Sequence, residues 1–334
     1  MKSLPRTIVA TGVLAAVAGT AMMGYFYARR SNSAQASPLP DLLTQIPAGA
    51  PTLIYVDLAA VRQSGFYQHR GALSPNVVPD NDYKEFVQAT GFDFEKDLDR
   101  VLIEAWPESV PGEHKKSVAV AEGRFDRKKI RDYAQRGGKI QQQEGHDVLL
   151  FQGNKSSEWI SLTFLNDHTV ALVQGSSIAP ALRSNSSAPS GDPIRERVTH
   201  IAGADIFLIT RMPSIPDNFG AGVLQSAAVV NLIRSVQWLS LAARPEGDNL
   251  RVSLEGECAT STDARQLQSA LETLRVFAQT GLGMQRPQTQ TESSRKLWEP
   301  LLKTIDITQS GERVRILVEL PPEVLSYNIP KKVE

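Results

Sequence analysis

The sequence has almost no cysteine and no imbalance of charge. Among its 334 residues, Cys258 is the single cysteine, which excludes an internal disulfide framework and any cysteine-rich metal site. The usual lipoprotein anchor is also excluded, because no cysteine lies near the N-terminus. Lys plus Arg and Asp plus Glu are equal at 36 each, so no net field favours nucleic acid or an anionic surface. With 41% hydrophobic and 22% charged residues, the composition suits a globular protein of about two domains.

The sequence also lacks the common catalytic motifs. It contains no Gly-x-Ser-x-Gly elbow, no His-Glu-x-x-His pair and no phosphate-binding loop. A metal site would need the fold to gather five dispersed histidines: His69, His114, His146, His168 and His200. We therefore predict a protein that is not an enzyme and has no metal or cofactor. One alternative stays open, a hydrolase that uses dispersed residues such as Asp57, His69 or His200.

Two clusters of charge have plain structural interpretations. The stretch Asp93 to Asp99 places four carboxylates in seven residues, but it lacks the central glycine and the distal glutamate of a calcium loop. We interpret it as the start of a short helix, where the helix dipole favours acidic residues. The basic runs Lys115-Lys116 and Arg127 to Lys129 carry no interleaved aromatic residues. We interpret both as solvated faces rather than a nucleic-acid site.

Residues 1–30 predict a single transmembrane anchor. Thr7 to Ala28 carries no charge, and at about 1.5 Å per residue a helix of this length crosses a hydrocarbon core. The aromatic residues Tyr25 to Tyr27 and the pair Arg29-Arg30 mark its far end. The alternative is a signal sequence cleaved after Ala36, where the sequence has the small-x-small form of a cleavage site.

Both alternatives export most of the chain if the basic N-terminus stays in the cytoplasm. We predict a single-pass membrane protein whose bulk is extracytoplasmic, in the periplasm, or a secreted protein if cleavage occurs. Residues 31–40 are rich in Ser, Ala, Asn and Pro, which is typical of a flexible tether.

A strand, turn, strand, helix layout occurs twice and predicts two similar lobes. The first copy spans Leu98 to Gly138 and the second spans Val236 to Gly283. A low-complexity linker at residues 185–192 separates a first lobe, 41–184, from a second, 193–330. We predict an α+β fold in which each lobe is an antiparallel sheet with helices on one face, a ferredoxin-like duplication.

Alternating polar and apolar residues predict which faces are buried. Trp159–Phe164 and Thr169–Gln174 are expected to form a hairpin, with Ser161 and Thr163 on the polar side of a half-buried strand. In the second copy, one side of the second strand is apolar: Val252, Leu254, Gly256 and Cys258. A helix from Asp263 to Thr280 is expected to pack on that side through one stripe: Leu267, Leu271, Leu274 and Ala278.

Trp106 and Trp238 are the candidate interface residues. Each lies in the first strand of a repeated unit, and the apolar residues of both strands take the opposite parity. If those apolar residues face the helices, both tryptophans point to the uncovered face of their sheet, where an aromatic residue marks an interface or a ligand groove. The alternative is that this face packs against the other lobe.

Two stretches resemble a known group of bacterial proteins. The group is exported or membrane-anchored and is classed among domains of unknown function with repeated ferredoxin-like α+β units. The resemblance rests on Leu42 to Leu58 (Leu-Leu-Thr-Gln-Ile-Pro-Ala-Gly-Ala-Pro-Thr-Leu-Ile-Tyr-Val-Asp-Leu) and on Thr90 to Leu98 (Thr-Gly-Phe-Asp-Phe-Glu-Lys-Asp-Leu). It covers about a fifth of the chain and implies an anchor followed by α+β units, with no activity.

The leading functional hypothesis is a membrane-anchored extracytoplasmic protein of the bacterial envelope that acts as a non-enzymatic binding or scaffold module. Its expected partners are the membrane, through the N-terminal helix, and an envelope protein, but not nucleic acid. An alternative of another class is a carrier that holds a lipid-like apolar ligand between sheet and helices, which requires an internal cavity of about 300 Å³ or more.

Overall fold

The fold is that of a computed structural model of the whole chain. It describes residue 42 and residues 49–64, 81–106, 116–152, 159–182, 193–201, 203–212, 235–246, 249–284 and 301–321. The predicted anchor 1–30, tether 31–40 and linker 185–192 lie outside these residues. Within the part of the chain that the structure describes, no helix is both long and apolar enough to cross a bilayer.

The chain forms two compact units, and the division between them falls inside β8 (Ile206–Arg211). The described residues up to Phe207 belong to the first unit, apart from residues 61–64, and the later ones belong to the second. Each unit consists of an antiparallel sheet and helices, so the predicted α+β class is confirmed.

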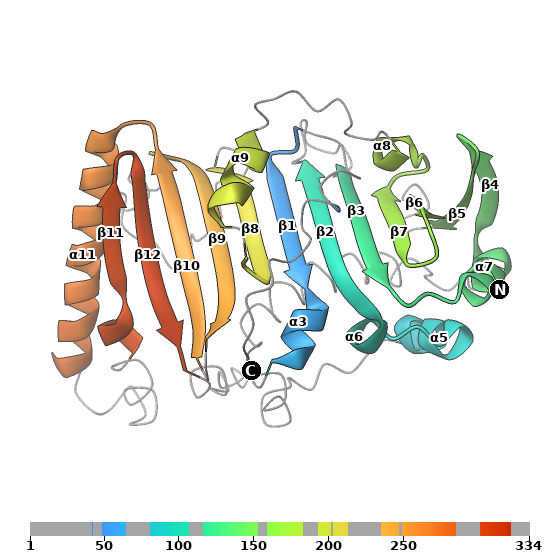
Figure 1. Cartoon of the computed structure of the whole chain (residues 1–334), viewed down its shortest axis with the longest axis horizontal. Coiled ribbons are helices and arrows are strands. Elements are labelled where there is room, and N and C mark those ends of the chain that lie inside the picture. The colour runs from blue at the N-terminus through green and yellow to red at the C-terminus, as the bar shows by residue number, and fades with distance from the viewer. Residues whose placement is uncertain are drawn as a thin grey trace, which may run out of the picture. The chain divides into compact units, whose positions relative to one another are not determined.

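The sheet of the first unit is entirely antiparallel (Figure 1). Its strands lie in the order β1 (Thr52–Asp57), β2 (Leu98–Trp106), β3 (Lys116–Gly123), β7 (Thr169–Gln174), β6 (Trp159–Phe164), β5 (His146–Gln152) and β4 (Lys139–Gln143). The predicted hairpin from Trp159 to Gln174 is β6 and β7, with Leu162 opposite Leu172.

The centre of this sheet is buried on both faces. Ile103 of β2 lies opposite Ala119 of β3, and both pack in a core with Phe86 of α5 (Asn81–Thr90). On the other face, Leu102 lies opposite Val120, and both are 0% exposed. The strands therefore have continuous apolar runs instead of a clean alternation.

The polar side predicted for β6 is buried as well, which corrects the expectation of a half-buried strand. Ser161 is 0% exposed and Thr163 is 1% exposed. Each hydroxyl donates to a backbone carbonyl, Ser161 to Gly175 at 2.6 Å and Thr163 to Asp147 at 3.0 Å. Burial is tolerated because these hydrogen bonds satisfy the hydroxyl groups.

Helix α7 (Arg127–Gly137) lies against the far end of this sheet. Its N-cap is Asp126, whose carboxylate accepts from the backbone N–H of Lys129 at 3.0 Å. Ile130 and Ala134 are buried against Leu149 and other apolar residues of β5 and β6. The helix is thus fixed by a cap and an apolar face, and its remaining faces are free to carry charge.

Three short helices complete the first unit. They are α6 (Phe94–Asp97), α8 (Ala179–Leu182) and α9 (Pro193–His200). Helix α3 (Leu58–Gln63) follows β1, and Asp57 caps it, because the Asp57 carboxylate accepts from the Ala60 N–H at 2.7 Å.

The second unit has a smaller sheet and one long helix. Its strands lie in the order β9 (Val236–Glu246), β10 (Asn249–Cys258), β12 (Arg313–Leu320) and β11 (Asp306–Ser310), with α11 (Ser261–Met284) packed on β10, β11 and β12 (Figure 1). The face predicted to be apolar is the covered one, because Cys258 is buried with Ala264 and Leu267 of α11.

The predicted stripe on α11 is wrong in its second half. Leu267 and Leu271 pack in the core, but Leu274 is 43% exposed and Ala278 is also exposed. The reason is that polar side chains hold this half of the helix. The Arg275 guanidinium donates to the Ile305 carbonyl at 2.9 Å, and the Gln279 amide donates to the Leu302 carbonyl at 3.1 Å.

The two glycines that follow glutamate in β3 and β10 differ in the room around them. A Cβ on Gly123 would collide with the backbone oxygen of Asp97, whereas a Cβ on Gly256 would lie 3.4 Å from the methyl groups of Val236. We expect Gly123→Ala to lower the free energy of unfolding by roughly 2 kcal/mol or more, because the backbone must move. Gly256→Ala is the matched control and should change it by less than about 1 kcal/mol. Urea unfolding measures both, and equal losses would contradict this packing.

Candidate functional site

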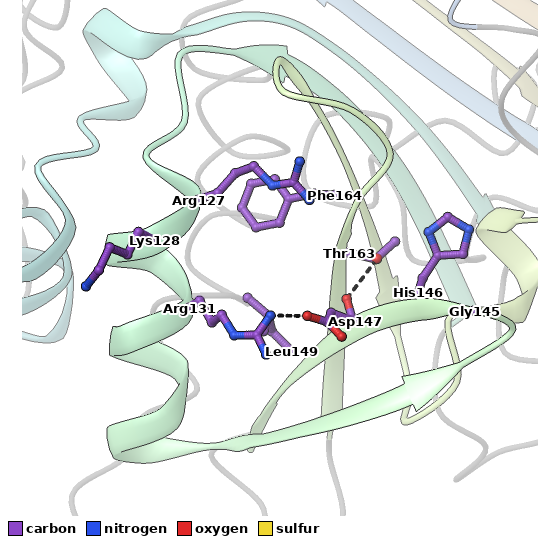
Figure 2. Close-up of a pocket in the computed structure, with 9 residues that line it drawn as sticks. All are labelled: Arg127, Lys128, Arg131, Gly145, His146, Asp147, Leu149, Thr163 and Phe164. Atoms are coloured by element: carbon purple, nitrogen blue, oxygen red, sulfur yellow. Dashed lines mark hydrogen bonds and ion pairs between the residues drawn. The ribbon is translucent and has the colours of Figure 1, made fainter.

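A hollow of about 450 Å³ lies beside α7 in the first unit (Figure 2). It is lined from α7, from the β4–β5 turn and β5, and from β6. The lining residues are Arg127, Lys128, Arg131, Gly145, His146, Asp147, Leu149, Thr163 and Phe164. Its volume falls in the range of sites for small molecules.

Arg127 lies over an aromatic ring at the edge of the hollow. The carbon of its guanidinium lies 5.0 Å from the centre of the Phe164 ring, within the range of a cation–π contact. Its Nη1 also donates to Asp167 at 2.9 Å, but the side chain of Asp167 is 81% exposed. A carboxylate so exposed to water is a weak partner for the guanidinium.

Arg131, one turn further along α7, forms an ion pair with Asp147 across the hollow (Figure 2). The Gln142 amide donates to the other oxygen of the same carboxylate, and Thr163 donates to the backbone carbonyl of Asp147 at 3.0 Å. Asp147 is therefore well fixed, while the ion pair itself is about half exposed and is worth about 0–1 kcal/mol.

Lys128 lines the hollow with its stem but points away from it (Figure 2). Its amine forms an ion pair with Asp132 at 2.6 Å, on the outer side of the helix. The hydrogen bond to Asp132 and its negative charge raise the pKa of Lys128. The cations that face the hollow are therefore the guanidinium groups of Arg127 and Arg131.

The two arginines of the hollow are suited to binding an anion. Guanidinium groups stay protonated and donate hydrogen bonds in a planar fork, so they bind carboxylate or phosphate but do not exchange protons. The interpretation of Arg127 to Lys129 as a solvated face is confirmed, because all three side chains are exposed. It gave no sign of the hollow, because the other residues that line it, such as Arg131, Asp147 and Phe164, lie outside that run.

A second candidate surface is the C-terminal half of α11. Leu274, Val276 and Phe277, named here the apolar end of α11, are 43%, 54% and 68% exposed. Val276 and Phe277 lie outside the stripe predicted to be buried. Two large apolar residues off that stripe are the feature of the sequence that indicates an exposed apolar surface. Leu274 and Phe277 are three residues apart and so are neighbours on the helix surface, whereas Val276 lies on another side. Exposed apolar residues that lie together mark an interaction site.

The two predicted interface residues, Trp106 and Trp238, are both half-buried. Trp238 lies opposite Glu257, on the side of the sheet away from α11. The register shifts between Glu257 and Cys258, so Val236 can face α11 although it is only two residues before Trp238. Trp106 shares its face of β2 with Leu102 and Glu104, which are 0% and 4% exposed. The centre of that face of β2 is therefore covered, so the expectation that Trp106 lies on an uncovered sheet face is wrong there. The role of Trp106 at an interface stays a prediction.

The dispersed polar residues have structural roles where they are described. Asp93 caps α6 by accepting from the Glu95 N–H at 3.0 Å, and the Asp97 carboxylate accepts from the Asp93 N–H at 2.9 Å. These two bonds agree with the interpretation of Asp93 to Asp99 as a helix start. Asp57 caps α3, and His200 is exposed at the end of α9.

Within the described residues, no three His, Cys, Asp or Glu side chains are placed to hold a metal ion. His146 lines the hollow and His168 is exposed in the β6–β7 turn. His69 and His114 lie outside the described residues.

Comparison with known proteins adds a likeness of fold. No protein-family model matches the chain, and no curated protein matches it. Among solved structures, three crystal forms of TP0453 are similar, each at 14% sequence identity. Form III has a TM-score of 0.48 and covers 86% of this chain and 96% of that one. Form IV has a TM-score of 0.46 and covers 88% of this chain and 96% of that one. Form I has a TM-score of 0.45 and covers 86% of this chain and 95% of that one. We draw no functional argument from a likeness at this level.

Cys258 should be unreactive in the folded protein. It is 2% exposed, and burial raises the pKa of its thiol, so the nucleophilic thiolate is scarce at neutral pH. We expect a disulfide reagent such as DTNB to label it at pH 8 at least about 100-fold more slowly than an exposed thiol. A Gln266→Cys variant supplies the exposed thiol on α11, and unfolding in urea should make both thiols equally reactive. Equal labelling in the folded state would contradict the burial.

Proposed function

We propose that the protein is a membrane-anchored extracytoplasmic module of the bacterial envelope that binds another protein and is not an enzyme. The observation that carries this proposal is the apolar end of α11, where Phe277 is 68% exposed at the end of a long helix. A partner that covers Phe277 would remove a large aromatic surface from water, and such residues dominate the energy of protein interfaces.

The charges around the apolar end favour a protein partner over a lipid surface. Helices that lie on anionic membranes carry Lys and Arg beside their apolar face. Residues 276–284 contain no charged side chain. The nearby Arg275 donates to the Ile305 carbonyl, just before β11, and forms an ion pair with Glu272 one turn earlier on α11. An uncharged apolar surface is the kind that pairs with the apolar surface of another protein.

The sequence of the N-terminus supports the placement at a membrane. The uncharged run from Thr7 to Ala28 is long enough to span a bilayer, and residues 31–40 would tether the two units to it. The protein would then hold its partner close to the membrane, because a tethered module has a high effective concentration there.

We also propose that Trp106 and Trp238 add a second contact with the partner. Both are half-buried aromatic residues with part of their surface available. Half-buried tryptophans are enriched among the residues that contribute most to binding.

A shared origin of the two units is part of the same proposal. In the first unit, β2 and β3 are followed by α7, and the last strand after this helix, β7, pairs with β3. In the second unit, β9 and β10 are followed by α11, and the last strand after it, β12, pairs with β10. A duplicated ferredoxin-like unit, enlarged by one hairpin in the first copy, would produce this pattern.

The proposal predicts which residues a partner needs. Affinity purification of the full-length protein from crosslinked native cells, followed by mass spectrometry, should recover a stoichiometric envelope protein. Phe277→Ser should reduce its recovery by about tenfold or more, since a central aromatic contact is worth about 2 kcal/mol. The matched control is Gln266→Ser, an exposed position three turns earlier on α11, which should have no effect. The double variant Trp106→Ala, Trp238→Ala tests the second contact.

Recovery of the same protein at the same level from wild type and Phe277→Ser would show that the partner does not bind at the apolar end of α11. If no protein is recovered, the purified chain should be extracted for bound lipid, which tests the carrier alternative instead.

Topology has its own test. In a Cys258→Ser background, a Gln266→Cys variant should react with a membrane-impermeant maleimide in cells whose outer membrane alone is permeabilised. The expectation follows from export of everything after the anchor. Labelling that appears only after the inner membrane is broken would place the two units in the cytoplasm and would overturn the envelope proposal.

A further inference from the structure

We infer that the hollow beside α7 binds a small anionic molecule through a phosphate or carboxylate group placed between Arg127 and Arg131. This site is independent of the proposed protein interface, because it lies in the first unit and the apolar end of α11 lies in the second. The two arginines are four residues apart on one helix, so their side chains leave the same side of α7 and border one space (Figure 2).

The first reason is that Arg127 is already positioned. Its guanidinium lies over the Phe164 ring at 5.0 Å, and Phe164 is itself packed edge to face with Phe125. A stacked guanidinium loses little freedom when its free edge receives an oxyanion, and this preorganisation favours binding. Its partner Asp167 is largely in water and is readily replaced by a ligand oxygen.

The second reason is that a ligand oxygen can take the place of the Asp147 carboxylate in its ion pair with Arg131. Asp147 keeps its hydrogen bond from Gln142, and its backbone carbonyl keeps the one from Thr163, when Arg131 turns to a ligand. The carboxylate would then not be left without donors. Asp147 thus acts as a competitor of the ligand for Arg131.

The third reason is that these ion pairs are not needed to dock α7. The helix is buried through Ile130 and Ala134 against Leu149 and its neighbours, and it is capped by Asp126. The two arginines are therefore not needed for attachment, and they border a space of about 450 Å³. That space fits a compact molecule rather than a polymer.

The test is calorimetric titration of the purified full-length protein in detergent, in a buffer without other oxyanions, at about 150 mM NaCl to screen non-specific attraction. The probes are inorganic phosphate, citrate as a carboxylate, and dihexanoyl phosphatidic acid as the lipid form of a phosphate. Saturable binding of one site per chain is expected for phosphate or citrate. If the lipid form binds more tightly than inorganic phosphate, the source of the group is a lipid head group; equal or weaker binding identifies a soluble anion.

Variants decide whether the hollow is responsible. Arg127→Gln and Arg131→Gln should each weaken binding by about tenfold or more, because each removes a charged donor. Lys128→Gln makes the same change of charge on the same turn of α7, but its amine points away, so it should weaken binding less than about twofold. Asp147→Asn should strengthen binding several-fold because it removes the competitor, and this gain cannot arise from a variant that fails to fold.

The proposal is overturned if none of the three probes gives saturable binding. It is also overturned if Lys128→Gln weakens binding as much as the two arginine variants do, since the attraction would then be a non-specific effect of charge. Unchanged or weaker binding by a folded Asp147→Asn variant would likewise exclude Arg131 as the shared ligand.

Discussion

The first unit depends on the pairing of β2 with β3, because both faces of this pair are buried. Ile103 opposite Ala119 faces the helices, and Leu102 opposite Val120 faces the other way, so a slip by one residue would exchange the two sets. This register fixes β7 beside β3, then β6 and β5 in turn. The position of Asp147 in β5, and with it the hollow beside α7, follows from that chain of pairings.

The elements themselves were predictable, and the burial of their faces was less so. The hairpin β6–β7, the helices α7 and α11 and the strand β10 follow from local alternation and caps, which are short-range signals. Ser161 and Thr163 were predicted on a polar face, but backbone carbonyls close in space satisfy them and allow burial. Leu274 was predicted in the core, but Arg275 and Gln279 hold that part of α11 through polar contacts.

The hollow beside α7 depends on contacts that sequence spacing does not show. Arg127 and Arg131 look like ordinary exposed helix residues until Phe164 is brought beside the first and Asp147 beside the second, from other strands. The two sites also use different forces. Binding at the apolar end of α11 would remove apolar surface from water and depend little on salt, whereas an anion between Arg127 and Arg131 would bind less well as salt increases. One module could therefore hold a protein and respond to a small anion separately.

The most direct test of the central claim is site-specific photocrosslinking in intact cells. A photoreactive amino acid replaces Phe277 in one strain and Gln266 in another, and crosslinked products are identified by mass spectrometry. The account predicts one discrete product with an envelope protein from position 277 and none from position 266. Products of the same pattern at both positions, or no protein product at position 277, would contradict a binding role for the apolar end of α11.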